Sequence, residues 1–430
     1  MVGTGYVGLT TGACLAYIGH DVTCADIDAR KIERLEQGEL PIVEDGLEEI
    51  VYHARAAGRL SFCIESTAAV ADADIVLLCV PTPQGDDGSA DLTYVRAAAG
   101  EIGPALRPDA IVVNKSTVPV GSTEVVAAAI GRDDVHVASN PEFLREGVAV
   151  LDFLRPSRVV IGADEPHVRD RLATLYDGLG AEIFRTDAAT AETIKYAANA
   201  FLATKISFIN DMSYLCDAVG ADVHDVADAI GMDPRIGRAF LNPGPGWGGS
   251  CFPKDSRALV SIAEDHGFDF PIMRSVISAN DRHRTRIVEQ VASLVHPDAP
   301  ERLDGVQVTA FGLTFKAGTD DLRESPSLYI LDRLIERGAS VHAFDPTTVG
   351  ELSPTQAQQL GGIRTHDDPL DAARGADIVL VLTEWPRFAS LDWDDLVDVV
   401  RQPVVFDARD VVDVEAARGS GFTLHRLGRR

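Results

Sequence analysis

Short continuous apolar runs alternate along this chain with longer amphipathic stretches, a pattern typical of an α/β protein with buried parallel strands. In the first part of the chain the predicted strands are residues 22–25, 75–80, 111–113 and 135–138. The same alternation returns later, where the predicted strands are residues 306–311, 341–344, 378–382 and 404–406. We therefore expect two Rossmann-like, doubly wound parallel-sheet domains.

Between these two parts, residues 191–219 contain no proline or glycine and are closed by Gly220, which predicts one long helix. Its apolar residues recur at steps of seven and form one broad apolar face, which includes Ile194, Phe201, Phe208 and Leu215. We expect this helix to join the two sheet domains and to contribute to a dimer interface. Lys195 and Asn199 are four residues apart and lie off that face, so both can project into one cleft. The predicted domains are residues 1–190, 191–295 and 296–430.

The chain opens with Gly3, Gly5 and Gly8 in G-x-G-x-x-G register, followed by a helical pattern, a strand and Asp26 at the end of that strand. This is the dinucleotide-binding fingerprint, in which the glycines allow a tight turn and the acid contacts ribose hydroxyls. Because a carboxylate repels a 2′-phosphate, Asp26 favours NAD over NADP. A first strand of roughly five residues should precede Gly3, so we expect a start assigned too late or a trimmed chain, and a weakened first strand.

Residues 246–255, GWGGSCFPKD, place a thiol, an ammonium group and a carboxylate behind a run of glycines. If the segment from residue 250 onward is helical, Cys251, Lys254 and Asp255 share one face. A thiol near a helix N-terminus and an ammonium group is biased toward the nucleophilic thiolate, so we interpret this segment as a reaction centre. The alternative interpretation is that Cys251 is a buried small hydrophobic residue.

Polar residues follow several predicted strands at their carboxyl ends, where open parallel sheets bind ligands. Thr82 and Thr117 occupy such positions and are candidate contacts, although threonine is also a common turn residue. In SNPEFLREG, residues 139–147, Glu142 and Glu146 are four residues apart and would share one face of a helix. We interpret this pair as functional, and the alternative is a solvated surface pair.

Several cations in the later part of the chain occupy positions that suit an anionic ligand. The stretch 232–248 is rich in glycine and proline and carries Arg235, a candidate for recognising an anionic group. Lys316, Arg323 and Arg409 follow strands of the second sheet domain. Cations gathered at one sheet edge are the arrangement that a diphosphate needs.

Composition narrows the class of protein further. A chain of 430 residues is too long for one core, so two or three domains are expected. The formal net charge of −27 argues against nucleic acid and anionic membranes as partners. No apolar run reaches the roughly 18 residues of a membrane helix, and we expect a cytoplasmic protein. The six cysteines show no CxxC pairing, so we expect neither a metal site nor a disulfide framework, and the five other than Cys251 are expected in the core.

Nearly the whole chain resembles the UDP-glucose/GDP-mannose dehydrogenase family. The motifs that carry the resemblance are GTGYVG, LPIVEDGL, VPTP, KSTVPVGST, NPEFLREG, KYAANAFLA, GWGGSCFPKD, FGLTFKAGTDDLRESP and FDAR. The resemblance implies a four-electron oxidation of the C6 alcohol of a sugar nucleotide to the acid with two NAD. UDP-glucose, giving UDP-glucuronate, is favoured by Arg409 after FDA and by the form of NPEFLREG. It also implies NAD binding by residues 1–190, UDP-sugar binding by residues 296–430, and a homodimer.

The resemblance further implies a role for individual residues. Cys251 matches the nucleophile that forms a thiohemiacetal and then a thioester, Lys195 matches the group that stabilises oxyanions, and Glu142 matches the base of thioester cleavage. The implied catalytic residues are Cys251, Lys195, Asn199, Asp255, Glu142 and Thr117. The implied cofactor-binding residues are Gly3, Gly5, Tyr6, Val7, Gly8, Asp26, Lys31, Thr82, Thr117, Glu146, Lys254 and Arg323. The implied substrate-binding residues are Glu142, Phe143, Leu144, Lys195, Asn199, Arg235, Phe240, Leu241, Gly248, Phe315, Lys316 and Arg409.

Three other functions remain open at this point. The same chemistry on GDP-mannose or on a UDP-N-acetylhexosamine is one alternative, because the motifs are shared. A two-electron NAD-dependent hydroxyacid dehydrogenase also has a Rossmann domain, a long helix and a lysine and asparagine pair, but it needs neither the cysteine nor a second Rossmann-like domain. A nucleotide-binding protein without enzymatic activity would not depend on Cys251.

Overall fold

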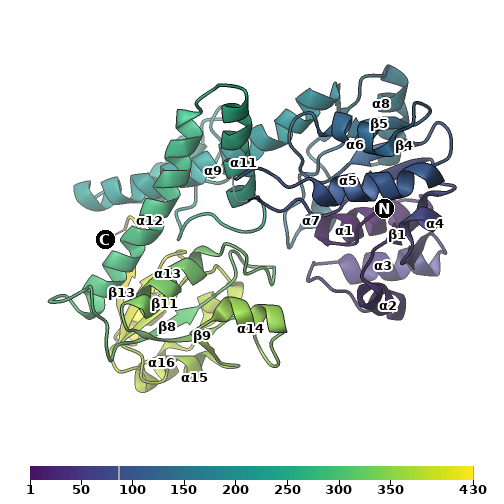
Figure 1. Cartoon of the computed structure of the whole chain (residues 1–430). Helices are drawn as coiled ribbons and strands as arrows, with labels where there is room; N and C mark the ends of the chain where they lie inside the picture. Colours follow the sequence, from purple (N-terminus) through teal and green to yellow (C-terminus); the bar gives the residue numbers. More distant parts are fainter. Residues whose placement is uncertain (86–87, 430) are drawn as a thin grey trace. The chain divides into compact units, whose positions relative to one another are not determined.

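The structure is a computed structural model that describes residues 1–85 and 88–429, and the chain divides into two compact units (Figure 1). The first unit holds Met1–Asn199 and Arg257–Asp269, and the second holds Ala200–Ser256 and Phe270–Arg430. Each unit contains a predominantly parallel sheet, and one long helix runs from the first unit into the second. The predicted fold class, α/β with two Rossmann-like sheets and a long central helix, is confirmed.

The first unit carries one sheet that is continuous only through Val2. Its strands are β1 (Val22–Ala25), β2 (Leu60–Cys63), β3 (Ile75–Leu78), β4 (Ile111–Asn114), β5 (His136–Ser139), β6 (Val159–Gly162) and β7 (Ile183–Thr186). β1 pairs with β2, and the other five pair in the order β3-β4-β5-β6-β7. Val2 forms parallel bridges to Ala25 in β1 and to Leu78 in β3. One residue therefore stands in place of the first Rossmann strand, and the weakened first strand that we expected is confirmed.

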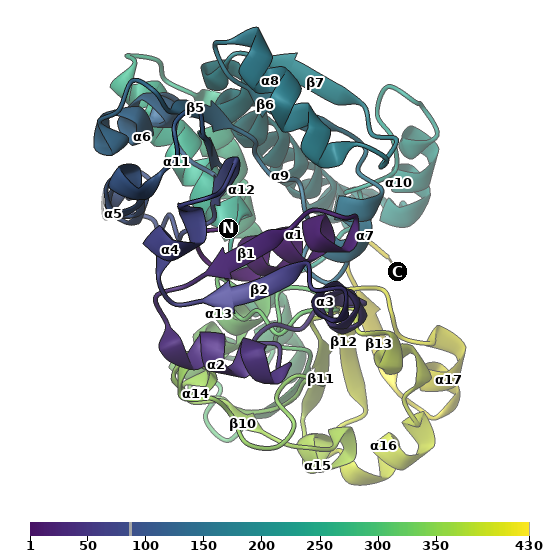
Figure 2. The ribbon, with the colours of Figure 1, turned by 90° about the vertical axis from the view of Figure 1, so that its right-hand side faces the viewer.

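Helices of the first unit follow its strands, as in a doubly wound fold. They are α1 (Tyr6–Tyr17), α2 (Ala29–Gln37), α3 (Leu47–Ala56), α4 (Ser66–Val70), α5 (Thr93–Ile102), α6 (Ser122–Ile130), α7 (Ala149–Leu154) and α8 (Pro166–Ala173), with 3₁₀ turns η1 (Gly103–Ala105) and η2 (Thr174–Tyr176). Figure 2 shows β1 and β2 side by side, with α1 next to β1. Leu9, Leu35, Leu47 and Ile111 are fully buried in one apolar cluster. One departure from a purely parallel sheet is the single antiparallel pair that joins β5 to β6.

The predicted central helix is α9, Ala188–Val219, which begins three residues earlier than the expected 191–219. The earlier start has a local cause, because the Asp187 carboxylate accepts hydrogen bonds from the Thr190 N–H at 2.7 Å and from its hydroxyl at 2.7 Å. The helices that follow are α10 (Val223–Gly231), α11 (Phe252–Asp265) and α12 (Pro271–Val295). No helix within residues 1–85 and 88–429 is long and apolar enough to cross a membrane.

The apolar face predicted for the central helix lies partly in solvent. Phe201 is 65% exposed, and Phe208 and Leu215 are each 52% exposed. Ile209 and Cys216, one residue further along the helix in each case, are buried. The apolar periodicity of α9 therefore marks two faces, of which one belongs to the core and the other is at least half exposed within the described residues 1–85 and 88–429.

The second unit contains a six-stranded parallel sheet in the order β10-β9-β8-β11-β12-β13. Its strands are β8 (Gln307–Phe311), β9 (Ser340–Phe344), β10 (Arg364–Thr365), β11 (Ile378–Val381), β12 (Val404–Asp407) and β13 (Thr423–Arg426). Its helices are α13 (Pro326–Glu336), α14 (Pro354–Leu360), α15 (Pro369–Ala373), α16 (Trp393–Val399) and α17 (Val414–Gly419), with the 3₁₀ turn η3 (Pro386–Ser390). Numbered within the unit, the strand order is 3-2-1-4-5-6, which is the Rossmann order.

Candidate active site

Gly3 and Gly8 of the fingerprint lie where a side chain would clash with the backbone, whereas Gly5 borders open space. Gly3 has a φ of +97°, and a Cβ there would lie 2.7 Å from the carbonyl oxygen of Cys79. A Cβ at Gly8 would lie 2.0 Å from the carbonyl oxygen of Gly3, so only glycine lets α1 pack this closely. Gly5 immediately precedes α1, and a Cβ there would meet nothing within 4 Å. The turn thus leaves space at a helix N-terminus, where the pyrophosphate of a dinucleotide fits.

Asp26 follows β1 and is held from several sides. Its carboxylate accepts hydrogen bonds from the Thr4 N–H at 2.9 Å, the Thr4 hydroxyl at 2.7 Å and the Asp28 N–H at 3.0 Å, and it pairs with Lys31 Nζ at 2.8 Å. Burial alone would raise the pKa of Asp26, but the hydrogen bonds from Lys31, Asp28 and Thr4 outweigh it and lower the pKa to about 2. Asp26 therefore stays ionised and suits a ribose hydroxyl better than a phosphate.

Glu44, which lies in LPIVEDGL, ties the fingerprint to the loop of Glu146, and the sequence analysis did not identify this role. The Tyr6 hydroxyl donates to the Glu44 carboxylate, which also accepts the N–H of Gly147 at 2.7 Å and of Ala149 at 2.6 Å. Burial, together with the hydrogen bond and charge of Glu44, raises the pKa of Tyr6 well above its usual value. Tyr6 therefore stays neutral and donates its hydroxyl hydrogen to Glu44. Glu146 is half-buried in the same loop as Gly147.

Two loops at the carboxyl ends of β3 and β4 meet through the predicted threonines. The Thr82 hydroxyl donates to the carbonyl oxygen of Thr117 at 2.9 Å. Just before Thr117, the buried Lys115 donates from Nζ to Asn140 Oδ1 at 3.0 Å. The Thr82 and Thr117 side chains thus lie at the sheet edge where open parallel sheets bind ligands.

Glu192, a second residue that the sequence analysis missed, fixes the end of the same loop. Its carboxylate accepts the N–H groups of Gly121 at 2.7 Å and Thr123 at 3.1 Å, at the N-terminus of α6. Burial raises the pKa of Glu192 to about 7, and the hydrogen bonds oppose this only in part. Its place three residues before Lys195 on α9 is the signal that could have revealed it, because residues three apart share a helix face.

Glu142 and Lys195 form a buried ion pair. Lys195 Nζ lies 2.9 Å from Glu142 Oε1, and their side chains are 4% and 6% exposed. The other carboxylate oxygen of Glu142 accepts the N–H of Leu144, and Lys195 Nζ lies 5.4 Å from the centroid of the Phe143 ring. Asn199 is buried one turn after Lys195 on α9. Of the predicted substrate-binding residues, the structure brings Glu142, Phe143, Leu144 and Lys195 together.

Residues 139–147 do not form the helix that would place Glu142 and Glu146 on one face. Residues 140–145 have no regular secondary structure, and α7 begins only at Ala149. Pro141 removes a backbone donor, and the Glu142 side chain folds back onto its own backbone at Leu144. Glu142 is buried whereas Glu146 is half-buried, so the two carboxylates do not share a face.

Cys251 stands immediately before α11, which begins at Phe252 rather than at residue 250. Its carbonyl oxygen accepts the N–H of Asp255 at 2.8 Å, the first bond of the helix, and its half-buried thiol therefore lies at a helix N-terminus. Cys251 thus precedes the helix, whereas Lys254 and Asp255 lie in its first turn. Lys254 Nζ donates to Asp255 Oδ1 at 2.7 Å, and the Asp255 side chain is 1% exposed. This position is one that favours a thiolate.

Burial keeps the thiols of most other cysteines protonated and therefore unreactive as nucleophiles. Burial raises the pKa of Cys14 and Cys79 to about 12 and that of Cys24 to about 11. Cys63, expected in the core, is half-buried.

The glycines before Cys251 pack against a loop of the second Rossmann-like sheet. A Cβ at Gly248 would lie 2.1 Å from the carbonyl oxygen of Glu324. Gly249 has a φ of +81°, a Cβ there would lie 2.8 Å from the Phe315 ring, and its N–H donates to the carbonyl oxygen of Arg323 at 3.1 Å. Within the second unit, the segment before Cys251 therefore packs directly against the loop that carries Phe315 and Arg323.

Arg409 holds the same loop from the other side. Its guanidinium donates to the carbonyl oxygens of Leu382 at 2.9 Å and Phe315 at 3.0 Å, and it pairs with Glu384 at 3.1 Å. Lys316 Nζ lies 5.6 Å from the Phe315 ring centroid.

Two other predicted cations, Arg323 and Arg235, form ion pairs with aspartates two residues away. Arg323 makes a two-pronged pair with Asp321 at 2.8 and 2.7 Å, and its side chain is 58% exposed. Arg235 pairs with Asp233 and is 86% exposed. In the same segment Leu241 is buried, and Phe240, with a φ of +65°, lies 6.3 Å from Phe252 between ring centroids.

The candidate residues belong to both units. The fingerprint, Glu142 and Lys195 belong to the first, whereas Cys251, Asp255 and Arg409 belong to the second. Val7 is half-buried in the first turn of α1.

Comparison with known proteins covers almost the whole chain. Residues 1–179, 189–282 and 309–414 match the NAD binding, central and UDP binding domains of the UDP-glucose/GDP-mannose dehydrogenase family. The chain is 41% identical over 434 residues to UDP-glucose 6-dehydrogenase TuaD of Bacillus subtilis, covering 100% of this chain and 92% of that protein. A UDP-glucose dehydrogenase from Pyrobaculum islandicum has a similar structure, with a TM-score of 0.89, 37% identity, and coverage of 100% and 97%. A UDP-D-ManNAc dehydrogenase from Pyrococcus horikoshii gives a TM-score of 0.86 at 26% identity, with coverage of 100% and 98%.

Proposed function

Because the chain belongs to the UDP-glucose/GDP-mannose dehydrogenase family, we propose that it oxidises UDP-glucose to UDP-glucuronate in two successive NAD-dependent steps. The chain is an NAD-dependent dehydrogenase. UDP-glucose is favoured because identity is 41% to TuaD and 37% to the Pyrobaculum enzyme, against 26% to the UDP-D-ManNAc dehydrogenase. The observation that supports the four-electron chemistry is the thiol of Cys251 at the N-terminus of α11.

A thiol solves the chemical problem of the second oxidation. The first step removes a hydride and a proton from the C6 alcohol and leaves an aldehyde, whose carbon must gain a substituent before it can lose a second hydride to become an acid. We propose that the Cys251 thiolate adds to this carbon and forms a thiohemiacetal. Loss of the second hydride gives a thioester, and water then cleaves the C–S bond, which releases the carboxylate and restores the thiol. NAD, bound at the glycine fingerprint, supplies the hydride acceptor for both oxidations.

Lys195 and Glu142 provide a buried ammonium group and a buried carboxylate for this sequence. In our proposal the Lys195 ammonium stabilises the negative charge that develops on the C6 oxygen, with the Asn199 amide as a second donor. Glu142 accepts a proton from the water that attacks the thioester, and Asp255 and Thr117 help to hold that water. Lys195 Nζ and Glu142 Oε1 lie 2.9 Å apart, so the two groups lie together away from bulk solvent.

Recognition of the sugar nucleotide is proposed for the loop that packs on the glycines before Cys251. Its Phe315 and Lys316, together with Arg409, offer an aromatic face and cations. Gly248 brings its backbone close to this loop, because a side chain there has no space. Leu241 is proposed as a further contact to the sugar nucleotide through its backbone. Arg235 is exposed, which suits contact with a second subunit.

A homodimer is proposed through the exposed apolar stripe of α9, which consists of Phe201, Phe208 and Leu215. These three side chains are half or more exposed although they recur at steps of seven on one helix. Such a stripe is more often an association surface than a solvated one.

The decisive experiment counts NADH formed per UDP-glucose consumed. We expect two NADH for the wild type, no completed turnover for Cys251→Ser, and unchanged stoichiometry for Cys63→Ser, the matched control at another half-buried cysteine. One NADH per substrate, or full activity of Cys251→Ser, would return the chain to the two-electron hydroxyacid class. Greater kcat/KM with GDP-mannose or a UDP-N-acetylhexosamine would instead reassign the substrate.

A further inference from the structure

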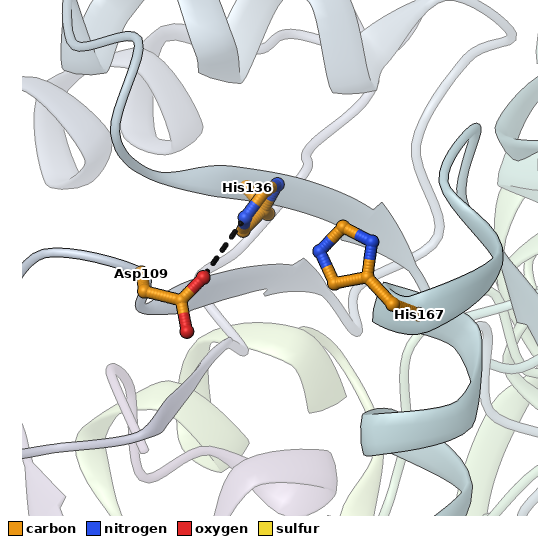
Figure 3. Close-up of side chains that lie close together, drawn as sticks. All are labelled: Asp109, His136 and His167. Carbon is orange, nitrogen blue, oxygen red and sulfur yellow. Dashed lines mark hydrogen bonds and ion pairs between the residues drawn. The ribbon is translucent and has the colours of Figure 1, made fainter.

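Three potential metal ligands come together at the amino-terminal edge of the first sheet (Figure 3). Asp109 lies two residues before β4, His136 is the first residue of β5, and His167 lies in the first turn of α8. β4 and β5 are parallel neighbours in which Ile111 pairs with His136, so both strands begin at this edge. Thr117 follows β4 at the opposite, carboxyl-terminal edge, so this group is separate from the glycine fingerprint and its cofactor.

The spacing of these side chains suits a small tetrahedral ion. His136 Nε2 lies 3.2 Å from Asp109 Oδ1. Two ligands at about 2.0–2.1 Å from a tetrahedral zinc ion are about 3.3 Å apart, so this pair needs no rearrangement. The ligand atoms of all three residues lie within 4.8 Å of one another, and the two imidazole rings meet edge to face with centroids 4.9 Å apart. His167 is exposed, so its side chain has room to close the remaining gap.

Neighbouring charges hold two of the ligands in place. Arg171 Nη1 pairs with Asp109 Oδ2 at 2.9 Å and leaves Oδ1 directed at His136. On the far side of the His136 ring, Nδ1 lies 3.8 Å from Glu165 Oε1. A carboxylate behind a metal-binding imidazole orients the ring and raises the basicity of the nitrogen that faces the ion.

We propose that Asp109, His136 and His167 bind one divalent transition-metal ion, with water completing the coordination. Two imidazole nitrogens and one carboxylate oxygen select zinc, cobalt or nickel over magnesium and calcium, which prefer oxygen ligands. The ion joins the beginnings of β4 and β5 to α8, elements that are otherwise linked by backbone pairing and side-chain packing. Its effect is on the stability of the first unit rather than on the hydride transfer.

Zinc binding to the full chain tests the proposal. We use the Cys251→Ser variant as the parent, so that the half-buried thiol of Cys251 cannot itself bind the ion. After chelator treatment, titration calorimetry should show one Zn²⁺ bound per chain, and Zn²⁺ should raise the unfolding temperature. His167→Gln, at an exposed position that tolerates the change, should weaken binding at least tenfold and abolish the temperature shift. Glu165→Gln should weaken binding by roughly tenfold, and His266→Gln, at an exposed histidine immediately after α11, is the matched control.

Cobalt binding gives a second readout. Co²⁺ added to the same background should produce a visible absorption band of tetrahedral intensity that His167→Gln loses and His266→Gln keeps. Equal Zn²⁺ binding by His167→Gln and its parent, or no binding above that of a His136→Gln, His167→Gln double variant, would overturn the proposal.

Discussion

Lys195 Nζ lies 2.9 Å from Glu142 Oε1, and both side chains are almost wholly removed from solvent. Removing one partner leaves the other as an uncompensated buried charge. We therefore expect Lys195→Met and Glu142→Gln each to lower the free energy of unfolding by about 3–5 kcal/mol, in addition to their effects on activity. The double variant Lys195→Met, Glu142→Gln should recover most of this loss, because neither remaining side chain is charged.

Urea unfolding of the single and double variants measures this coupling. Arg235→Ala breaks an exposed pair with Asp233 and serves as the control, for which no measurable loss is expected. Losses from the two single changes that simply add in the double variant would contradict the pairing.

We expect Asp26 and Lys31 to set the preference between the two nicotinamide cofactors. Asp26→Asn removes the carboxylate that repels a 2′-phosphate and leaves the Lys31 ammonium, now 2.8 Å from that carboxylate, without its charged partner. We expect the ratio of kcat/KM for NAD over NADP to fall by roughly tenfold or more, since a hydrogen bond to a charged group is worth about 1.5–3 kcal/mol.

Steady-state kinetics with both cofactors measures this ratio. Asp28→Asn, which alters the neighbouring carboxylate that caps α2, should leave the ratio where it is. An unchanged ratio in Asp26→Asn would remove Asp26 from the cofactor site.

Glu192 should make stability depend on pH. Its pKa is raised to about 7 from 4.5 in the folded chain, so the folded state keeps a proton that the unfolded state loses. The contribution of this group is complete below pH 4.5 and is lost as the pH rises through 7, by up to about 3 kcal/mol. Relative to Glu192→Gln, the wild type should therefore become progressively less stable between pH 5 and pH 8.

Unfolding curves at four pH values across this range give the difference directly. Glu101→Gln, at an exposed carboxylate on α5 that does not contribute to the raised pKa of Glu192, is the control. A difference between wild type and Glu192→Gln that is constant with pH would show that Glu192 is ionised throughout.

Phe208 is the centre of the exposed stripe on α9, and a charge there should separate a dimer. We expect Phe208→Glu to halve the mass measured by light scattering, because a carboxylate cannot be buried against a second apolar stripe without a partner. Tyr52→Glu, which changes an aromatic residue that is 70% exposed on α3, should keep the wild-type mass. A wild type that is already monomeric at micromolar concentration would refute the dimer.

Local patterns predicted the elements that depend on local chemistry. Residues 22–25 were expected as a strand and form β1, because a continuous apolar run ends at a single acid. The central helix was foreseen from the absence of proline and glycine, and only its first three residues were missed. The capping role of Asp187 was overlooked there.

Other features depend on what the tertiary structure places nearby. Periodicity placed Phe201 and Phe208 on one apolar face of the helix. It could not tell whether the rest of the chain packs against that face. Spacing alone could not show whether residues 139–147 are helical, and the Glu142 carboxylate instead bonds to the N–H of Leu144. Asp109, His136 and His167 are separated by some thirty residues at each step and carry no motif. The register of β4 with β5 brings the first two together, and the packing of α8 against β5 adds His167.

The single bridge residue Val2 has a consequence for how the first unit opens. Residues 1–3 are connected to β1 by two backbone hydrogen bonds and by the terminal ammonium of Met1, which donates to the carbonyl oxygen of Thr23, and two backbone hydrogen bonds connect Val2 to β3 and Cys79. Beyond them, β1, β2 and their helices are coupled to the rest of the first unit by side chains around α1 and by the Glu44 carboxylate, which accepts the N–H groups of Gly147 and Ala149. The outer pair of strands with α2 and α3 is thus a separate cooperative segment, whose amide hydrogens exchange with solvent together and sooner than those of β4 and β5. NAD bound across Gly3 and Asp26 would fasten that segment to the remainder and slow its exchange.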